Sequence, residues 1–595
     1  MTTRIRRRDF LRYAAATAVA ASVPRAGRSD VFAATPDEID RVFPQGLASG
    51  DPTPNSVILW TRVEGAAATE TVLYEVALDP RFRRLVATGQ IPAEAAGDHT
   101  VKLNVVGLAP YTTYYYRFTA LGVTSVTGRT KTAPRPNQDV PVRFAFASCQ
   151  DFIGRYYHAW RALVEKEEDV DFVLFLGDYI YESGGGAPGS DRRIDLPDGL
   201  AIGGGSVALT LADYRTLYKR YRSDPYLKAA HQRFAFVTTW DDHEFANDCW
   251  QDHATDFSEA RGDEKSTSRR EAADQAWFEF QPVDVPFDAD ASYPDDIRIF
   301  RSVRYGRHVE LFVVDGRFYR ADHLIPEGPV DLTVGKFAAN SSLGSRNFVL
   351  KSAFDEREAG ARPTLLGAAQ KSWLIDAVKR SDASWKFLGN DVQMAQMAVD
   401  LSQFDKLPAQ YRAAFYISTD QWDGYRSERA EILQALADVD NLVSLAGDIH
   451  AFYAGELHVD FDRPSRPVAV EFVVAGITST SLQEEIEITV AGNPTLAALG
   501  LADLVPLADR IISDTNPHNV YAKSLSNGIA IVDVDRGRAI EVEFLLIDDV
   551  LSPDWDGSIE RVRFRVEDGV ARIQQGRRPL LRTPRIPTLR RLRLS

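Results

Sequence analysis

The sequence predicts an α/β protein preceded by a smaller all-β sandwich. From about Phe43 to Thr132, apolar residues fall in short β-rich runs separated by turns, which is typical of a sandwich. Beyond residue 141, apolar strands alternate with helical stretches, which is the pattern of a layered α/β sheet. The chain has 595 residues, of which 45% are hydrophobic and 26% charged, so it can bury a large core.

Composition and charge exclude several classes of function. The formal net charge is -15, and loss of the first 34 residues, with seven Arg and two Asp, makes it about -20. We therefore expect no regulatory binding of nucleic acid. Cys149 and Cys249 are the two cysteines, so at most one disulfide can form. No later stretch has ~18 consecutive apolar residues, so we expect no transmembrane segment.

Residues 1–34 have the organisation of an export signal. Residues 6–12 are rich in arginine, residues 13–23 are weakly apolar, and small residues with Arg25 follow. The Arg7-Arg8 pair just before Phe10-Leu11 resembles a twin-arginine signal peptide. We expect this segment to engage the twin-arginine export machinery and to place the protein in the periplasm or outside the cell. The alternative interpretation is a basic disordered tail.

Residues 40–132 are assigned to the sandwich and residues 133–140 to a linker. The segment from Leu108 to Arg117 resembles the tyrosine-corner strand of fibronectin type III and immunoglobulin-like modules. Two prolines in the linker favour an extended chain, so we expect the linker to hold the two parts of the protein apart. The expected strands of the sandwich are Val57–Thr61, Val72–Val76, Val101–Leu103 and Tyr114–Phe118.

The α/β region is assigned to residues 141–560, and a C-terminal segment with a basic tail to residues 561–595. The expected strands are Phe144–Ala147, Phe172–Leu176, Phe234–Val237, Leu311–Val314, Phe387–Leu388, Leu442–Leu445 and Val468–Ala475. In layered α/β folds, residues just past the carboxyl ends of strands meet in one crevice. Five of the strands are followed by residues that can bind a metal: Cys149, Asp178, Asp241-Asp242-His243, Asn390 and Asp448-Ile449-His450.

Two glycine clusters and the tail have no assigned chemistry. The clusters at 184–186 and 203–205 lack the Lys-Ser/Thr of a phosphate-binding loop, and we interpret them as a mobile insert beside the site. From Arg577 to the end the chain has seven Arg and no acidic residue. We interpret this tail as solvated, with a lid over the site as the alternative.

Three motifs carry a resemblance to a known family. They are Gly177-Asp178, Asp241-Asp242-His243-Glu244 and Gly447-Asp448-Ile449-His450, and they resemble the signatures of calcineurin-like metallophosphoesterases. Asp242 stands where that superfamily usually has Asn, and Asp448 where it usually has His. Tyr181 is similar to a phenolate ligand of purple acid phosphatases, and Cys149 completes a set that resembles the alkaline phosphatase D (PhoD-like) family. The resemblance covers residues from about 40 to 550 and implies a four-layer αββα metallophosphoesterase domain.

The residues themselves indicate a site for two metal ions. Asp178 follows a strand on a glycine turn, where its two carboxylate oxygens can bridge ions ~3.5–4 Å apart. Thiolate, phenolate and imidazole from Cys149, Tyr181 and His450 form a set that suits ferric iron. The resemblance implies the same ion, Fe(3+), at this position.

Oxygen donors form the rest of the expected site. Asp242, Asp448 and Asn390 suit a hard ion such as calcium better than zinc, and the resemblance implies Ca(2+) here. Asn390 is the weakest of the three, because Gly389-Asn390 is also an ordinary turn pair. His243 is expected to stabilise or protonate the leaving oxygen. Each residue alone is more often structural than functional, but together at five strand ends they favour a site.

Other candidates are weaker. Asn247 lies four residues after His243, so the two can share a helical face and contact substrate together. Arg317 can clamp a phosphate group, although pairing with Asp315 is an equal alternative. Cys249 belongs to no motif and is expected to be a buried thiol, either in the core or behind the metal ligands.

We therefore expect an exported, metal-dependent phosphoester hydrolase that acts on phosphomonoesters, with phosphodiesters as a further class of substrate. One alternative is a phospholipase D-like phosphodiesterase of the same fold. A second is a non-enzymatic, exported module that binds metal or holds a polymer at the cell surface. The expected partners are phosphate ester substrates and the export machinery, and the protein is expected to be a monomer.

Overall fold

The computed structural model describes residues 34–167, 170–185, 192–202, 205–255, 264–325, 347–492 and 500–576. The predicted export signal up to residue 33, part of the glycine-rich insert and the basic tail from residue 577 lie outside these residues. Within the described part, no helix is both long and apolar enough to cross a membrane.

A ten-stranded sheet forms the first half of the α/β core. Its central strands β9, β10, β13 and β1 run parallel, and the strands on either side pair antiparallel. The order across the sheet is β27 (Gln574–Gln575), β26 (Glu560–Glu567), β25 (Ala539–Ile547), β24 (Asn527–Val534), β9 (Val142–Ala147), β10 (Phe172–Phe175), β13 (Ala235–Thr238), β1 (Leu47–Gly50), β2 (Ser56–Arg62) and β5 (Thr100–Val106).

A seven-stranded sheet forms the second half. Strands β15, β17, β20 and β22 are parallel in its centre, and β14, β21 and β23 add antiparallel pairs at its edges. The order is β14 (Arg301–Tyr305), β15 (Val309–Val313), β17 (Trp385–Gly389), β20 (Leu442–Ala446), β22 (Ala469–Val473), β21 (Phe452–Leu457) and β23 (Asn519–Lys523).

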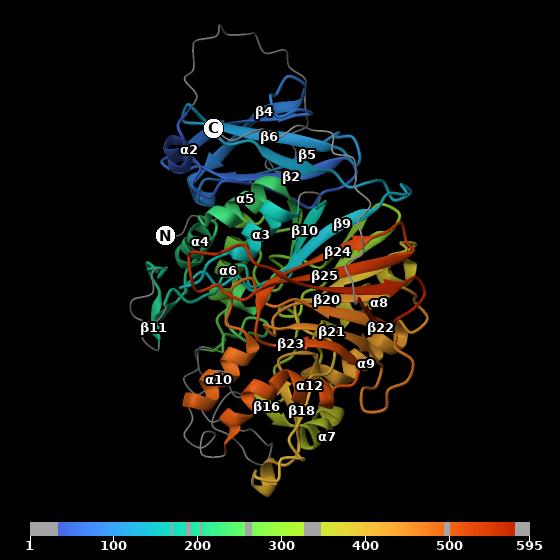
Figure 1. Cartoon of the computed structure of the whole chain (residues 1–595). Coiled ribbons are helices and arrows are strands. Elements are labelled where there is room, and N and C mark those ends of the chain that lie inside the picture. Colours follow the sequence, from blue (N-terminus) through green and yellow to red (C-terminus); the bar gives the residue numbers. More distant parts are fainter. Residues whose placement is uncertain are drawn as a thin grey trace.

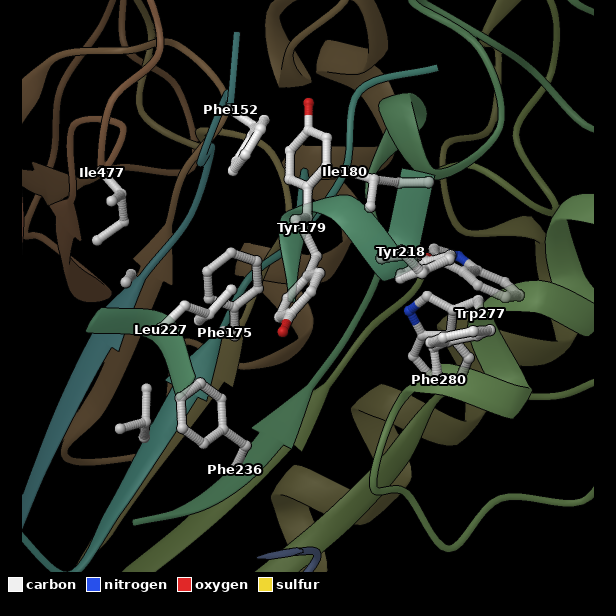
Figure 2. Packing of buried hydrophobic residues seen from close by; sticks show 14 of the residues in the cluster. Phe152, Phe175, Tyr179, Ile180, Tyr218, Leu227, Phe236, Trp277, Phe280 and Ile477 are labelled. Atoms are coloured by element: carbon white, nitrogen blue, oxygen red, sulfur yellow. The ribbon is translucent and has the colours of Figure 1, made fainter. Parts of the chain in front are cut away.

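The two sheets pack face to face, and helices cover their outer faces. Along β9, Phe144 and Phe146 are buried between the sheets, whereas Ala145 and Ala147 face the helices, as the two-residue period of a strand requires. Figure 2 shows part of the helix-side core, where Tyr218, Trp277 and Phe280 pack together. The covering helices are α3 (His158–Lys166), α4 (Leu211–Tyr221), α5 (Pro225–Arg233) and α6 (Thr267–Phe280) on one side, and α8 (Gly367–Arg380) and α9 (Arg426–Ala435) on the other.

The N-terminal part is β-rich, as predicted, and a mixed α/β architecture follows it. Strands β1, β2 and β5 pack through a shared apolar core against a second sheet. The hydroxyl of Tyr114, near the start of β6, accepts a hydrogen bond at 2.7 Å from the backbone N–H of Ala109, in the turn before that strand. The likeness to fibronectin type III modules stays a prediction. The remaining elements here are α2 (Pro36–Val42), β3 (Thr69–Ala77), β4 (Leu85–Glu94), β6 (Thr113–Ala120), β7 (Val123–Thr124) and β8 (Gly128–Lys131).

The expectation that the linker holds the two parts apart is wrong. Strand β1 pairs in parallel with β13, with Ser49 opposite Ala235, so the N-terminal part continues the main sheet. The indole N–H of Trp60 donates to the carbonyl of Glu279 at 2.8 Å and anchors β2 on α6. The physical reason is the edge of β13, whose backbone groups would lack partners without β1.

A group of small elements lies at the far end of the molecule from the β-rich part (Figure 1). A three-stranded sheet is the base on which two helices pack. The group consists of β16 (Asn347–Leu350), α7 (Lys351–Ala361), β18 (Ala398–Asp400), β19 (Ala414–Ser418), α10 (Leu482–Gly492), η6 (Leu501–Asp503), η7 (Val505–Leu507) and α12 (Ala508–Thr515). A separate hairpin of β11 (Leu200–Ile202) and β12 (Gly205–Val207) belongs to the glycine-rich insert.

Candidate metal centre

The ends of the parallel strands of both sheets border one pocket of about 470 Å³. Cys149, Asp178, Asp448 and His450 all have positive φ angles, between 54° and 64°. This left-handed conformation is costly for residues other than glycine and tends to occur where function requires it. The turns after β9, β10 and β20 are therefore bent in a way that brings their polar side chains together.

The first cluster joins a thiol, a carboxylate, a phenol and an imidazole. Ligand atoms of Cys149, Asp178 and His450 lie within 4.8 Å of one another. The hydroxyl of Tyr181 belongs to the same cluster, since it is 3.2 Å from Asp178 Oδ2 and 3.3 Å from His450 Nε2. The hydroxyl of Ser479 lies 2.5 Å from that of Tyr181 and donates to the carbonyl of Cys149. The four residues predicted around the ferric ion are thus brought together.

His450 is held in the form that can bind a metal. Its Nδ1 lies 2.8 Å from the carbonyl oxygen of Thr480, to which it donates, so Nε2 turns toward Tyr181. Burial and the charge of His243 lower the pKa of His450 to about 4. The imidazole is therefore neutral at ordinary pH, with its free Nε2 lone pair in the cluster.

The second cluster consists of carboxylates. Oxygen atoms of Asp178, Asp241, Asp242 and Asp448 lie within 4.8 Å of one another. Asp178 belongs to both clusters and thus stands between an N/S/O set and an all-oxygen set. Asp420, with Asp242 and Asp248, extends the acidic surface along the pocket.

Asn390 follows β17 as predicted, but its side chain is engaged elsewhere. Its Oδ1 accepts a hydrogen bond from the indole N–H of Trp422 at 3.3 Å, and it is only 1% exposed. Among the residues that the structure describes, its Nδ2 has no hydrogen-bond partner. The proposed role of Asn390 as a calcium ligand therefore stays a prediction.

Glu244 joins the loops that follow β10 and β13. Its carboxylate accepts hydrogen bonds from the backbone N–H groups of Asp178 (2.9 Å), Tyr179 (2.7 Å) and Asp241 (2.9 Å). The two loops touch at Gly177, whose φ is +104° and where a Cβ would lie 2.5 Å from the backbone nitrogen of Asp241. One buried side chain thus sets the distance between the shared ligand and the acidic cluster.

His243 is paired with a carboxylate that the sequence analysis did not identify. Its Nδ1 is 2.6 Å from Glu182 Oε2, and Glu182 also accepts from the backbone N–H of Asn247. Burial lowers the pKa of His243, but the charges of Glu182, Asp242 and Asp178 outweigh it and raise this pKa well above its usual value. The imidazolium lies on the wall of the pocket, where it can donate a proton.

Arg317 is fully buried and holds carboxylates in place. Its Nε donates to Asp241 at 2.5 Å, its Nη1 to Asp420 at 2.7 Å and its Nη2 to Asp448 at 3.1 Å. Asp315, the partner considered from sequence, instead accepts from the backbone N–H of Arg317. The side chain lies behind the acidic cluster, and a direct contact with phosphate stays a prediction.

The remaining candidates differ in their access to the pocket. Asn247 is exposed and lines the pocket, as a substrate contact requires. Cys249 is buried, and its thiol faces the carbonyl of Asp242 at 3.8 Å. Asp420 and Gln421 also line the pocket, and neither was predicted as a site residue.

The arrangement of charge fits bound cations. Burial raises the pKa values of Cys149, Asp178 and Asp448 well above their usual ranges, and neighbouring acidic groups add to each shift. The charge of His243 opposes the shift at Asp178, and the charge of Arg317 opposes the shift at Asp448. Buried anionic groups in this number need positive charge, which metal ions at the two clusters would supply.

Comparisons with known proteins agree over most of the chain. The model of the PhoD-like phosphatase family matches residues 144–544, and the model of the PhoD-like phosphatase N-terminal domain matches residues 29–134. Alkaline phosphatase D of Bacillus subtilis (strain 168) is 34% identical over 461 residues, or 75% of this chain and 71% of that protein. A solved structure of PhoD aligns with a TM-score of 0.70 and 28% identity over 91% of this chain and 94% of that chain.

Proposed function

Because the chain belongs to the PhoD-like phosphatase family, we propose that it is a metal-dependent hydrolase of phosphate esters, acting on monoesters and also on diesters. The family expected from the sequence motifs is confirmed. The observation that carries the proposal is the position of Asp178, which is common to both ligand clusters. A shared carboxylate is what a dinuclear phosphoesterase needs.

We propose that iron binds the cluster of Cys149, Asp178, Tyr181 and His450, and that calcium binds the carboxylates. The donor types support this division, because thiolate, phenolate and imidazole suit ferric iron and carboxylates suit calcium. When bound, the ions would stabilise charge on the phosphoryl oxygens and make a water molecule more acidic, and therefore a better nucleophile.

Two side chains of the protein supply the proton that the leaving alcohol needs. Glu182 accepts the Nδ1–H of His243 and fixes the ring, so that Nε2–H is available in the pocket. As water attacks phosphorus and the bond to the ester oxygen breaks, Nε2 gives its proton to that oxygen, and the alcohol leaves neutral. Asn247, exposed beside His243, can bind the ester group through its amide.

The paired histidine also favours an enzyme over an exported metal-binding module. A structural metal site requires its ligands, but it does not require a charged imidazole on the pocket wall that a buried glutamate holds in place.

We propose that the protein is exported through the twin-arginine route as a monomer. The signal-like residues 1–34 support export.

Metal analysis combined with two assays tests the function. Protein with its metals in place should hydrolyse 4-nitrophenyl phosphate and bis(4-nitrophenyl) phosphate, contain iron and calcium, and lose activity on chelation. A fully active protein without iron would contradict the assignment of iron. Metal-loaded protein that hydrolyses neither ester would contradict the hydrolase itself.

A further inference from the structure

Ser479 contacts the first ligand cluster but is not one of its proposed ligands. It lies in the loop after β22, and its side chain is 1% exposed. Its hydroxyl donates to the carbonyl oxygen of Cys149 at 2.9 Å and accepts from the backbone N–H of Asp151 at 3.3 Å. The same hydroxyl oxygen lies 2.5 Å from that of Tyr181. Ser479 therefore joins the loop after β9 to the phenol of a proposed iron ligand.

The hydrogen bonds of this hydroxyl fix where the phenol proton lies. Ser479 gives its one proton to the carbonyl of Cys149, and one of its two lone pairs receives the N–H of Asp151. The second lone pair is left for Tyr181, so the phenol of Tyr181 is the donor in the short contact. A phenol has to lose this proton before it can bind a metal ion. In the metal-loaded protein, Ser479 therefore faces a phenolate.

Ser479 can turn its own proton toward that phenolate at little cost. The carbonyl oxygen of Cys149 also accepts from the backbone N–H groups of Thr478 and Ser479, each at 3.4 Å, so it keeps partners when the hydroxyl turns away. The oxygens of Ser479 and Tyr181 are already 2.5 Å apart, which is within the range of an O–H···O⁻ bond and below the usual separation of two neutral hydroxyls. The change therefore requires only the rotation of one hydroxyl.

The other polar neighbours of the phenol cannot donate to it. Asp178 Oδ2, at 3.2 Å, is a carboxylate oxygen. His450 Nε2, at 3.3 Å, carries a lone pair, because Nδ1 of this ring donates to the carbonyl of Thr480. Of these three contacts of Tyr181, the one with Ser479 alone can supply a proton.

We propose that Ser479 donates a hydrogen bond to the phenolate of Tyr181 in the metal-loaded protein and thereby raises the reduction potential of the iron. The inference rests on the proposed function, because it takes Tyr181 as an iron ligand. A phenolate that accepts a hydrogen bond gives less electron density to a ferric ion, which makes Fe(3+) easier to reduce. The bond also lowers the energy of the phenolate electrons, so charge transfer from phenolate to iron absorbs at shorter wavelength. Ser479 acts through Tyr181 and is a positioning residue.

Two buried serines provide a matched pair of variants. Ser479→Ala removes the proposed donor. Ser481→Ala removes a hydroxyl that is also 1% exposed but donates to Glu484 at 2.8 Å. In the iron-loaded Ser479→Ala protein, we expect the charge-transfer band to move to longer wavelength and the Fe(3+)/Fe(2+) potential to fall. Ser481→Ala should match the wild type in both measurements.

Resonance Raman spectra detect the hydrogen bond itself. Excitation within the band selects the vibrations of the bound phenolate, and the C–O stretch should shift when the wild-type protein is transferred to D₂O. This isotope shift should be absent from Ser479→Ala and present in Ser481→Ala. An unchanged band and potential in Ser479→Ala would overturn the proposal. Equal changes in the two serine variants would also overturn it, because they would indicate a general structural effect.

Assays on the same preparations distinguish this role of Ser479 from the proposed function. If the spectra change as expected but neither 4-nitrophenyl phosphate nor bis(4-nitrophenyl) phosphate is hydrolysed, the role of Ser479 stands and the phosphatase assignment falls. If an ester is hydrolysed but the band does not respond to Ser479→Ala, the phosphatase assignment stands and the role of Ser479 falls. Active protein without a phenolate band would remove Tyr181 as an iron ligand and Ser479 with it.

Discussion

The side chain of Asp178 has to serve two ligand clusters at once. Its carboxylate belongs to the cluster of Cys149 and His450 and also to the carboxylate cluster, and its backbone has a φ of 57°. A residue that merely bound one ion would not need both oxygens at a strained turn. Asp242 contributes to the acidic side and not to the first cluster.

The first prediction compares substitutions at these two aspartates. Asp178→Asn should lose both metals and lower kcat/KM by more than about 100-fold, since changes even outside the ligand shell cost 10–100-fold. Asp242→Asn should weaken only the oxygen-rich site and recover activity in excess calcium. Metal content and turnover of both variants, expressed without residues 1–34, provide the measurement. Normal metal content in Asp178→Asn would show that it does not bridge.

The pair of His243 and Glu182 leads to a second prediction. His243→Ala should keep the metals and lose about 10²–10⁴-fold in rate on alkyl esters, with a smaller loss on 4-nitrophenyl phosphate. The reason is that a basic alkoxide needs a proton to leave, whereas nitrophenolate does not. Glu182→Gln should show the same selectivity to a lesser degree. Equal losses on both substrates would count against an acid role for His243.

At the scale of elements, the site depends on the distance between two loops. The loops after β10 and β13 belong to adjacent parallel strands, and the carboxylate of Glu244 bonds to the backbone of both. Glu428 provides a comparison away from the site, because it is equally buried and accepts from the backbone N–H groups of Leu365 and Leu366.

The third prediction uses this comparison. Glu244→Gln places an amide N–H₂ against backbone donors and should lower metal affinity by about 10–100-fold as well as the melting temperature. Glu428→Gln should lower the melting temperature alone. Metal titration and thermal melting of both variants make the test. If the two lost metal affinity equally, Glu244 would have only a general structural role.

The ligands at strand ends could be predicted from sequence, because parallel strands carry their carboxyl ends to a common edge. Cys149, Asp178 and His450 meet for this reason. Glu182 and Ser479 could not be predicted, since they lie on irregular segments whose positions depend on the packing of the whole fold. A small apolar pocket between α10, α12 and β18 is also a tertiary feature.

At the scale of the whole molecule, the β-rich part and the α/β region form one structure. The linker prolines suggested separation, but sequence alone does not show that the edge of β13 is open to a strand so far away along the chain. Gly50 lies at this junction, and a Cβ there would be 2.0 Å from the carbonyl oxygen of Pro282 and 2.7 Å from that of Phe236. The junction is therefore sensitive to a single methyl group.

The fourth prediction follows from this contact. Gly50→Ala should destabilise the protein by about 1–3 kcal/mol, because backbone atoms must move to admit the methyl group. Gly97→Ala in the same part of the chain is the control, since its nearest contact would be Thr100 Oγ1 at 3.7 Å. Chemical denaturation of both variants gives the free energies of unfolding. Equal stabilities would mean that the junction adapts freely.

The order of strands in the large sheet has a consequence for biosynthesis. Strand β1 is synthesised early but can pair only after β13 has been made. Strand β9 can pair with β24 only when almost the whole chain has left the ribosome. Pairings between such distant segments are slow to form, and until then the apolar faces of β9 and β10 are open to aggregation. The nascent chain cannot fold as a series of finished modules. A chain that stopped before β24 would be released with its central sheet still open.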